Sequence, residues 1–292
     1  MLTPTPSSTK TFTYHGGPVM SGITVYYIWY GNWLANSATS ILSDFASSIG
    51  GSSYWAINTQ YPDGAGNQPA NTVFFAGSTT DSYSRGKSIS DGDIRGIVSD
   101  AISSNRLPRD PNGVYFVLTS SDVTTDGFCT SLCGYHENFS HNGVDIKYSF
   151  VGNADRCPTS CAASENQTDS PNGNVGADAM ASVIAHELEE TVTDPDLNGW
   201  YGASISEENA DSCAWTFGDT YPSGGGTANI HLGARDFLIQ RNLIPVGTPS
   251  CALELHYSHA SGNTGPGVRG DFDGDGIADV LWRNARTGDV SV

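Results

Sequence analysis

The stretch "HELEETVTDP", residues 186–195, places ionisable side chains at a spacing that suits metal chemistry. Residues four apart on an α-helix share one face, so His186 and Glu190 would point the same way. An imidazole and a carboxylate are both ordinary ligands of zinc. Glu187 would project beside them, where its carboxylate could act as a general base toward water. We therefore predict a helix that carries two metal ligands and one catalytic base.

A third ligand would come from the segment "EENADSC" further along the chain. Together with the helix, this segment resembles the gluzincin pattern of thermolysin-like peptidases. In that pattern a downstream glutamate completes the zinc site, and an aspartate orients a ligating histidine. The resemblance implies that Glu208 binds the metal and that Asp211 supports a ligand. Asp211 and Asp194 are alternative ligands, and Glu207 is an alternative to Glu208.

The pattern departs from that of gluzincins at Glu190, where those peptidases have a second histidine. Two carboxylate ligands place more negative charge on the cation and weaken it as a Lewis acid. They also favour harder cations such as Mn²⁺ or Ca²⁺. We therefore predict a site for Zn²⁺ or another divalent cation, one that could bind metal and catalyse poorly. The alternative is an acidic surface helix with an incidental histidine.

Three further side chains are weaker candidates for the same site. His136 in "CGYHENF" and His15 in "YHGGP" could serve as ligands or stabilise a transition state. A lone histidine in a loop is, however, more often solvent-facing. Tyr201 follows the helix and could donate a hydrogen bond to an oxyanion, although packing is the more common role of such a residue.

The cysteines favour disulfides over a metal site, because their number is even and their spacing is not that of a zinc knuckle. They fall in three groups: Cys129 and Cys133, Cys157 and Cys161, and Cys213 and Cys251. We predict that each group forms one disulfide. Disulfides imply an oxidising compartment, so we predict a secreted protein. The first residues have no apolar signal core, so we expect either that a secretion signal has been removed or that Met1 is an added start.

The charge balance limits the classes of partner. The 292-residue chain has 31 acidic and 13 basic residues, a net charge of −18. Nucleic-acid binding depends on Lys and Arg meeting phosphates, so this balance argues against it and against anionic membrane surfaces. An acidic surface permits solubility outside the cell and cation binding. We also predict no membrane span, because no apolar run is long enough.

Apolar patterning predicts a layered α/β sheet. Helices are indicated at residues 38–48, 91–107 and 177–193, and strands at 22–30, 71–77, 113–123 and 145–153. Strands that alternate with helices are typical of such a sheet. Comparison with zinc peptidases implies a zincin-like layered domain. It would have a mixed sheet, an antiparallel edge strand, an active-site helix at 177–193 and disulfide-stapled loops.

Seven blocks of sequence, in order, resemble the phosphate-induced protein 1 / EXORDIUM family. They are "YHGGPVMSGITVYYIWYGNW", "PNGVYFVLTSSDVTTDGFCTSLCGYH", "YSFVGNADRCPTSCA", "GADAM", "HELEETVTDPDLNGWY", "EENADSC" and "GARDFLIQ". The resemblance covers residues 14–251. It implies a secreted, cell-wall-associated protein linked to growth, as in plant members, and by itself supplies no biochemical activity.

The C-terminal segment "GDFDGDGIADVLWRNARTGDVSV" resembles one FG-GAP repeat. Its closely spaced aspartates would repel one another without a cation, and oxygen ligands at this spacing suit Ca²⁺. The predicted ligands are Asp271, Asp273, Asp275, the carbonyl of Ile277, and Asp279. Blades of this kind need neighbours to bury their faces, so we expect a short β fragment that is only part of a repeat.

We predict four segments: a flexible lead at 1–13, an EXORDIUM-like, metallopeptidase-like domain at 14–257, a linker at 258–269 and the partial repeat at 270–292. The main functional prediction is a secreted metal-dependent hydrolase, a peptidase that acts on peptides or proteins, including those of the extracellular matrix or cell wall. The alternative is a non-catalytic extracellular binding protein of the EXORDIUM family. A third possibility is a carbohydrate-active enzyme that uses Glu187 and Glu208 as paired carboxylates.

Overall fold

The computed structural model describes residues 12–255, 282–283 and 290–291. The chain divides into two units, residues 1–255 and 256–292. In the second unit, β16 (Trp282–Arg283) pairs antiparallel with β17 (Val290–Ser291). The linker predicted at 258–269 lies outside the described residues, and so do the predicted calcium ligands Asp271, Asp273, Asp275, Ile277 and Asp279. The calcium site and the partial repeat therefore stay predictions.

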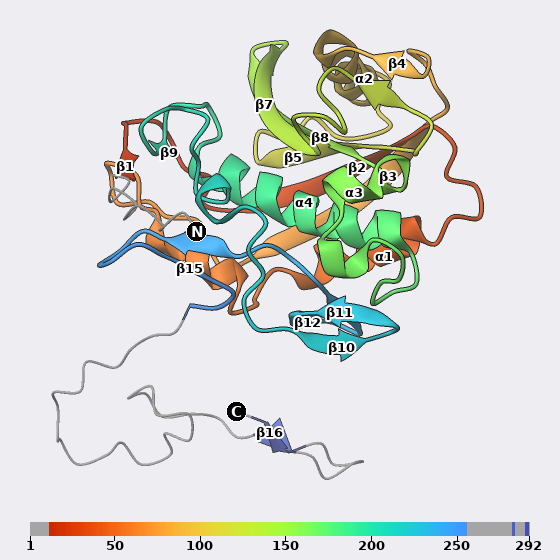
Figure 1. Ribbon diagram of the computed structural model, residues 1–292. Coiled ribbons are helices and arrows are strands. Elements are labelled where there is room, and N and C mark those ends of the chain that lie inside the picture. The colour runs from red at the N-terminus through yellow and green to blue at the C-terminus, as the bar shows by residue number, and fades with distance from the viewer. Residues whose placement is uncertain (1–11, 256–281, 284–289, 292) are drawn as a thin grey trace, which may run out of the picture. The chain divides into compact units, whose positions relative to one another are not determined.

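The centre of the first unit is a five-stranded mixed sheet in the order β3-β2-β5-β8-β7 (Figure 1). The strands are β2 (Ile23–Tyr30), β3 (Val73–Asp81), β5 (Gly113–Thr119), β7 (Gly134–His141) and β8 (Val144–Gly152). The first four strands in the sheet order are parallel, and β7 runs antiparallel to β8 at the edge. Strand β7 was not among the strands predicted from the sequence.

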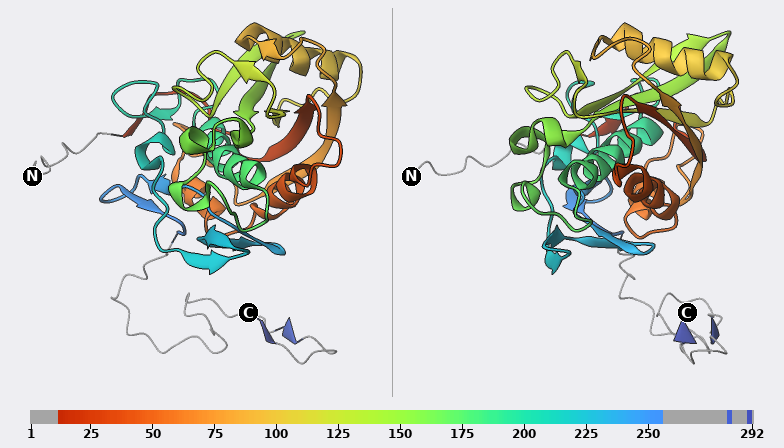
Figure 2. Two further views of the ribbon diagram at one scale, coloured as in Figure 1. Left: turned by 45° about the vertical axis from the view of Figure 1, so that its right-hand side comes forward. Right: turned by 90° about the vertical axis from the view of Figure 1, so that its right-hand side faces the viewer.

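Helices cover both faces of the sheet. Helices α1 (Ala38–Ser48) and α4 (Val175–Thr193) pack on one face, and α2 (Asp91–Ser103) packs on the other (Figure 2). Strand β2 is buried on both sides, so its alternate side chains enter different cores. Val25, Tyr27 and Trp29 join the core of α1 and α4, whereas Tyr26, Ile28 and Tyr30 join the core of α2. The structure is therefore a mixed α/β domain with two apolar cores.

Helix α4 is buried along almost its whole length because the sheet, α1 and the later loops surround it. Its start is fixed by Asn174, whose side chain accepts a hydrogen bond from the backbone N–H of Ala177 at 3.0 Å. Polar residues on such a helix are taken out of water and need partners. Among the helices of the described part, α4 included, none has the length and apolar character needed to cross a membrane.

Short elements complete the first unit. Five two-stranded ladders pair β1 (Thr13–Tyr14) with β9 (Trp200–Tyr201), β4 (Ser88–Ile89) with β6 (Thr124–Thr125), β10 (Tyr221–Ser223) with β11 (Gly226–Ala228), β12 (Ile230–Leu232) with β13 (Arg235–Phe237), and β14 (Asn242–Ile244) with β15 (Ser250–Ala252). The short helices are η1 (Trp55–Gln60), η2 (Ala154–Arg156), α3 (Pro158–Cys161), η3 (Ser164–Asn166) and η4 (Asp211–Cys213).

Three disulfides staple the loops, but two of the predicted pairings were wrong. The observed pairs are Cys129–Cys157, Cys133–Cys161 and Cys213–Cys251. The segments at 129–133 and 157–161 lie side by side, and their Cα–Cα separations of 5.8 and 5.6 Å suit bonds between the segments. Only the pair 213–251 was predicted correctly.

Candidate metal centre

A pocket of about 460 Å³ opens between α4, the start of β7 and the segment that follows residue 207. Six of its lining residues carry an imidazole or a carboxylate: His136, His186, Glu187, Glu190, Glu208 and Asp211. None of the lining residues is Lys or Arg. Four carboxylates and two imidazoles thus meet in one cavity that attracts cations.

Helix α4 contributes three of these side chains. His186 and Glu190 lie one turn apart, and the imidazole Nε2 is 3.0 Å from a carboxylate oxygen of Glu190. Glu187 is only 4% exposed and also lines the pocket. The charges of Glu190, His186 and His136 act on its carboxylate, so Glu187 belongs to the same cluster of ionisable groups.

Strand β7 contributes His136, which was a weaker candidate for the site in the sequence analysis because a lone loop histidine is more often solvent-facing. It is only 6% exposed, and its Nε2 lies 3.0 and 3.1 Å from the two carboxylate oxygens of Glu208. The position follows from the strand register, in which His136 stands opposite Ser149 of β8. Because these residues were predicted to form a loop, neither the strand register nor the direction of the imidazole could be predicted.

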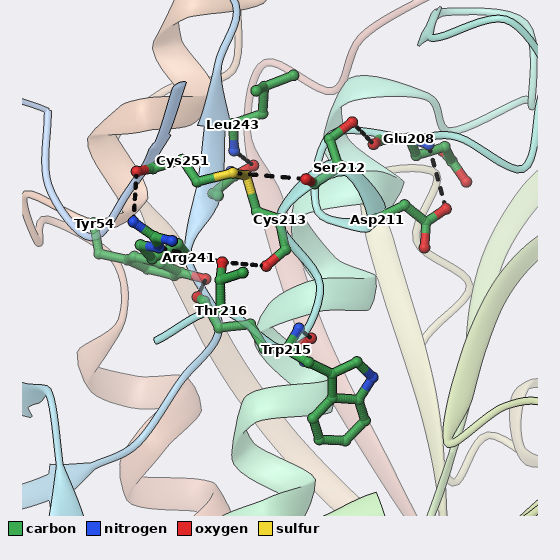
Figure 3. The surroundings of a disulfide bond; sticks show 12 residues. Tyr54, Glu208, Asp211, Ser212, Cys213, Trp215, Thr216, Arg241, Leu243 and Cys251 are labelled. Atoms are coloured by element: carbon green, nitrogen blue, oxygen red, sulfur yellow. Dashed lines mark hydrogen bonds between the residues drawn. A yellow bond between two sulfur atoms is a disulfide. The ribbon is translucent and has the colours of Figure 1, made fainter. Parts of the chain in front are cut away.

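The segment after residue 207 brings in Glu208 and Asp211 (Figure 3). The backbone N–H of Asp211 donates to a Glu190 carboxylate oxygen at 3.1 Å, and the backbone N–H of Glu208 donates to Asp211 at 3.3 Å. The Cys213–Cys251 disulfide fixes the end of the segment. Glu207, the sequence alternative, instead accepts a hydrogen bond from the backbone N–H of Ala203.

The potential ligand atoms form two groups, in each of which all atoms lie within 4.8 Å of one another. One group is His136, Glu190 and Glu208, and the other is His186, Glu190 and Asp211. The set predicted from the sequence, His186, Glu190 and Glu208, is divided between them. Glu190 belongs to both groups. Imidazole nitrogens with carboxylate oxygens form an ordinary donor set for Zn²⁺ and related divalent cations.

The mutual proximity of these groups shifts their pKa values. Burial raises the pKa of Glu187, and the neighbouring Glu190 adds to the effect, so that it reaches about 8. Burial and Glu190 likewise raise the pKa of Glu208 to about 8, although His136 opposes the change. Burial lowers the pKa of His136, but Glu208 outweighs it and raises the pKa to about 9. In the absence of a cation, protons compensate part of the negative charge.

The polar atoms that remain unpaired fit a cation-binding pocket. The Nδ1 atoms of His136 and His186 are buried without a hydrogen-bond partner in the described part of the chain. Both imidazoles direct Nε2 toward carboxylates, so Nε2 is the nitrogen that is placed to act as a metal ligand. Buried carboxylates are costly unless they are paired or bind a metal. The residues present therefore fit a divalent cation.

Three other candidates from the sequence are not among the residues that line the pocket. Asp194 ends α4, and one of its carboxylate oxygens accepts a hydrogen bond from the backbone N–H of Gly199 at 2.5 Å. The ring of His15 stacks on the ring of Tyr201, with 3.5 Å between the centroids. These residues hold the turn after α4 and the N-terminal segment in place.

Glu189, which the sequence analysis did not single out, points away from the pocket. It is fully buried near Tyr54 and Tyr61, and burial raises its pKa well above the ordinary value. Two consecutive glutamates of one helix thus face different environments, because successive residues are turned by about 100°. Only Glu190 reaches the potential ligands.

The fold and the pocket define a disulfide-stapled α/β protein with a buried carboxylate–imidazole centre. The chain belongs to the phosphate-induced protein 1 / EXORDIUM family: residues 12–232 match the region described as "Phosphate-induced protein 1 conserved region". The match includes the whole sheet and the two histidines and four acidic residues of the pocket. The family resemblance drawn from the sequence blocks is thereby confirmed.

Plant proteins are among the relatives. Protein EXORDIUM-like 5 from Arabidopsis thaliana is 36% identical over 252 residues, which cover 76% of this chain and 68% of the relative. Protein EXORDIUM-like 3 from the same plant is 35% identical, with 76% and 74% covered. Protein PHOSPHATE-INDUCED 1 from Nicotiana tabacum is 29% identical, with 73% and 75% covered. The names of these relatives state no catalytic activity.

Proposed function

We propose that the protein is an extracellular binding protein of the EXORDIUM family and that its pocket holds a divalent cation. The observation that carries this proposal is the convergence of four carboxylates and two imidazoles, without Lys or Arg, on one cavity. A cation would compensate the buried negative charge and fix the segment after residue 207 against α4. Binding is placed before catalysis because the relatives are named without an activity.

Two observations support the extracellular location. All six cysteines are paired in disulfides, which persist in oxidising compartments. The matched family is one of EXORDIUM proteins, whose plant members led us to expect a secreted, cell-wall-associated protein. In that setting the partner would be a component of the cell wall or matrix, or a protein or peptide.

Metal-dependent hydrolysis, of peptides in the first place, is a second candidate because of Glu187. This carboxylate lines the pocket and belongs to neither ligand group. It could therefore accept a proton from a water molecule held in the pocket. A divalent cation held by the neighbouring histidines and carboxylates would supply Lewis acidity. The antiparallel edge strand beside α4 supports a zincin-like arrangement for this reaction.

The test is the metal content of the purified full chain. Protein stripped with a chelator is dialysed separately against Zn²⁺, Mn²⁺ and Ca²⁺ and analysed by inductively coupled plasma mass spectrometry. We expect wild type to retain at least one ion that His186→Ala with Glu190→Ala does not. The exposed histidine variant His231→Ala is the matched control and should retain as much metal as wild type. Equal metal in all three proteins would refute the proposed cation site.

A further inference from the structure

We propose that the pocket holds two divalent cations that share the carboxylate of Glu190. This inference rests on the proposed cation site and specifies how many ions it takes. One position is formed by His136, Glu190 and Glu208, and the other by His186, Glu190 and Asp211. The two imidazoles would serve different ions.

The distances between potential ligand atoms assign the two imidazoles to different ions. A ligand atom of Zn²⁺ lies about 2.1 Å from the ion, so two ligands of one ion are at most about 4.2 Å apart. His136 Nε2 is 3.0 Å from Glu208, and His186 Nε2 is 3.0 Å from Glu190 and 3.5 Å from Asp211. Among the described residues, no group with all ligand atoms within 4.8 Å of one another combines the two histidines. One ion therefore does not gather both imidazoles in this arrangement.

Glu190 is placed to belong to both positions. It is only 4% exposed, and its carboxylate lies at the junction of α4 with the segment that carries Asp211. A carboxylate has two oxygens and can bind one cation with each of them. A carboxylate shared by neighbouring ions is therefore compatible with the two groups around Glu190, which have no other member in common.

Charge also favours two ions. The pocket has four carboxylates: Glu187, Glu190, Glu208 and Asp211. With neutral imidazoles and all four carboxylates deprotonated, one divalent cation would leave about two negative charges uncompensated in a cavity without Lys or Arg, whereas two cations would balance all four. Bulk water stabilises the charges of the three glutamates only weakly, since each residue is no more than 6% exposed.

The carboxylate of Glu187 is an independent sign that the pocket takes a further ligand. This residue is more than nine-tenths buried, lines the pocket and belongs to neither group. Beside it in the pocket, the buried Nδ1 atom of His136 has no hydrogen-bond partner within the described part of the chain. A buried acceptor in this position needs a donor, and water molecules bound to cations in the pocket would supply it.

The experiment counts zinc ions bound to the full chain after chelation and equilibrium dialysis against Zn²⁺. Counts are compared between wild type, His136→Ala, His186→Ala and the double variant, so that any zinc bound outside the pocket cancels. We expect each single variant to lose one ion and the double variant to lose two. His231→Ala, an exposed histidine paired with Asp236, should lose none.

The outcomes separate this inference from the proposed function. If each single variant and the double variant all lose one ion, the cation site is established and the second position is overturned. No loss in any variant would overturn both.

His136→Gln keeps the size of the side chain and replaces His136→Ala if the latter does not fold. Mn²⁺ electron paramagnetic resonance needs no variant, and a spectrum without exchange coupling at full loading would also contradict a shared carboxylate.

Discussion

At the scale of single residues, Glu187 occupies a position that differs from those of its neighbours on α4. It lines the pocket, is almost fully buried and belongs to neither ligand group. Burial and the nearby Glu190 raise its pKa to about 8, so it accepts a proton more readily than an ordinary glutamate. This residue therefore distinguishes a cation-binding pocket from a hydrolytic one.

The substitution Glu187→Gln should leave the number of bound zinc ions unchanged, because Glu187 is not a proposed ligand. If the pocket also hydrolyses peptides, the rate should fall by about 100-fold or more, since an amide is not a general base. Dialysis with metal analysis and cleavage of a fluorogenic peptide library measure the two effects. Glu165→Gln, outside the pocket lining, is the matched control. Cleavage that survives Glu187→Gln would contradict the assigned role.

Asp122, which does not line the pocket, gives a pH-dependent contribution to stability. Its hydrogen bonds with Lys87, Ser120 and Tyr83 lower its pKa from 3.8 to about 2. A lowered pKa in the folded state stabilises the protein above pH 3.8, and this stabilisation is lost as the pH falls toward 2. Because the side chain is 42% exposed, we expect about 1 kcal/mol or less. Urea denaturation of Asp122→Asn should show a correspondingly smaller loss between pH 4 and pH 2; an unchanged loss would contradict it.

The sequence indicated the chemistry of the pocket better than its arrangement. Helical spacing alone placed His186 and Glu190 on one face, because backbone geometry fixes that relation. The segment with Glu208 was suggested only by resemblance. Whether His186 or His136 lies nearest to Glu208 depends on strand register and loop path, which no local pattern specifies.

At the scale of secondary structure elements, the close contact between β7 and α4 positions the pocket. At Gly134, an added Cβ would lie 2.6 Å from Val183 Cγ1 and 2.9 Å from Glu187 Oε1. A larger residue would push α4 away from the edge strand that carries His136. The absence of a side chain at this position therefore lets the helix and the strand approach.

The substitution Gly134→Ala should separate these elements. We expect a loss of about 1 to 3 kcal/mol in the free energy of unfolding and weaker zinc binding, because overpacking forces the backbone to move. Chemical denaturation and isothermal titration calorimetry measure the two effects. Gly22→Ala is the control, since an added Cβ there meets nothing within 4 Å. Wild-type affinity in Gly134→Ala would show that the contact does not position the site.

The disulfide Cys213–Cys251 should matter for both folding and cation binding. It closes a sequence separation of 38 residues and lies directly after the segment with Glu208 and Asp211 (Figure 3). Replacing both cysteines by serine should cost about 4 kcal/mol, from the entropy of the unfolded chain. We also expect zinc affinity to fall, because the segment loses its anchor.

The control for this prediction removes another disulfide. Cys129→Ser with Cys157→Ser opens a separation of 28 residues and should cost a similar free energy. Calorimetric titration should show a larger loss of zinc affinity for the 213–251 variant than for this control. Equal affinities in the two variants would contradict the anchoring role.

The parallel strands and main helices could be predicted, whereas the edge strand could not. Strands β2, β5 and β8 are almost wholly buried, and their continuous apolar runs are visible in the sequence. Strand β7, "GYHENFSH", is polar and adjoins a cysteine-rich segment, so its pattern is that of a loop. It is a strand because it pairs with β8 along its whole length. The disulfide pairing depends on the same tertiary contacts.

At the scale of the whole molecule, the charge of −18 and the pocket point to one property, an affinity for cations. General acidity alone would attract cations weakly and without a defined position. The pocket differs from general surface acidity because its imidazoles and carboxylates converge, and His136 and the three glutamates among them are buried. The ionisable residues of the pocket lie within the region that matches the family, and a bound cation would make the pocket a defined feature of the domain.

The most direct test of this account is anomalous diffraction from crystals of the full chain grown with Zn²⁺. We predict anomalous peaks at the zinc edge inside the pocket, next to Glu190, with His136 and His186 as nitrogen ligands. Crystals in which the pocket contains no anomalous peak, while zinc occupies other parts of the molecule, would contradict the central claim that these buried side chains form a metal centre.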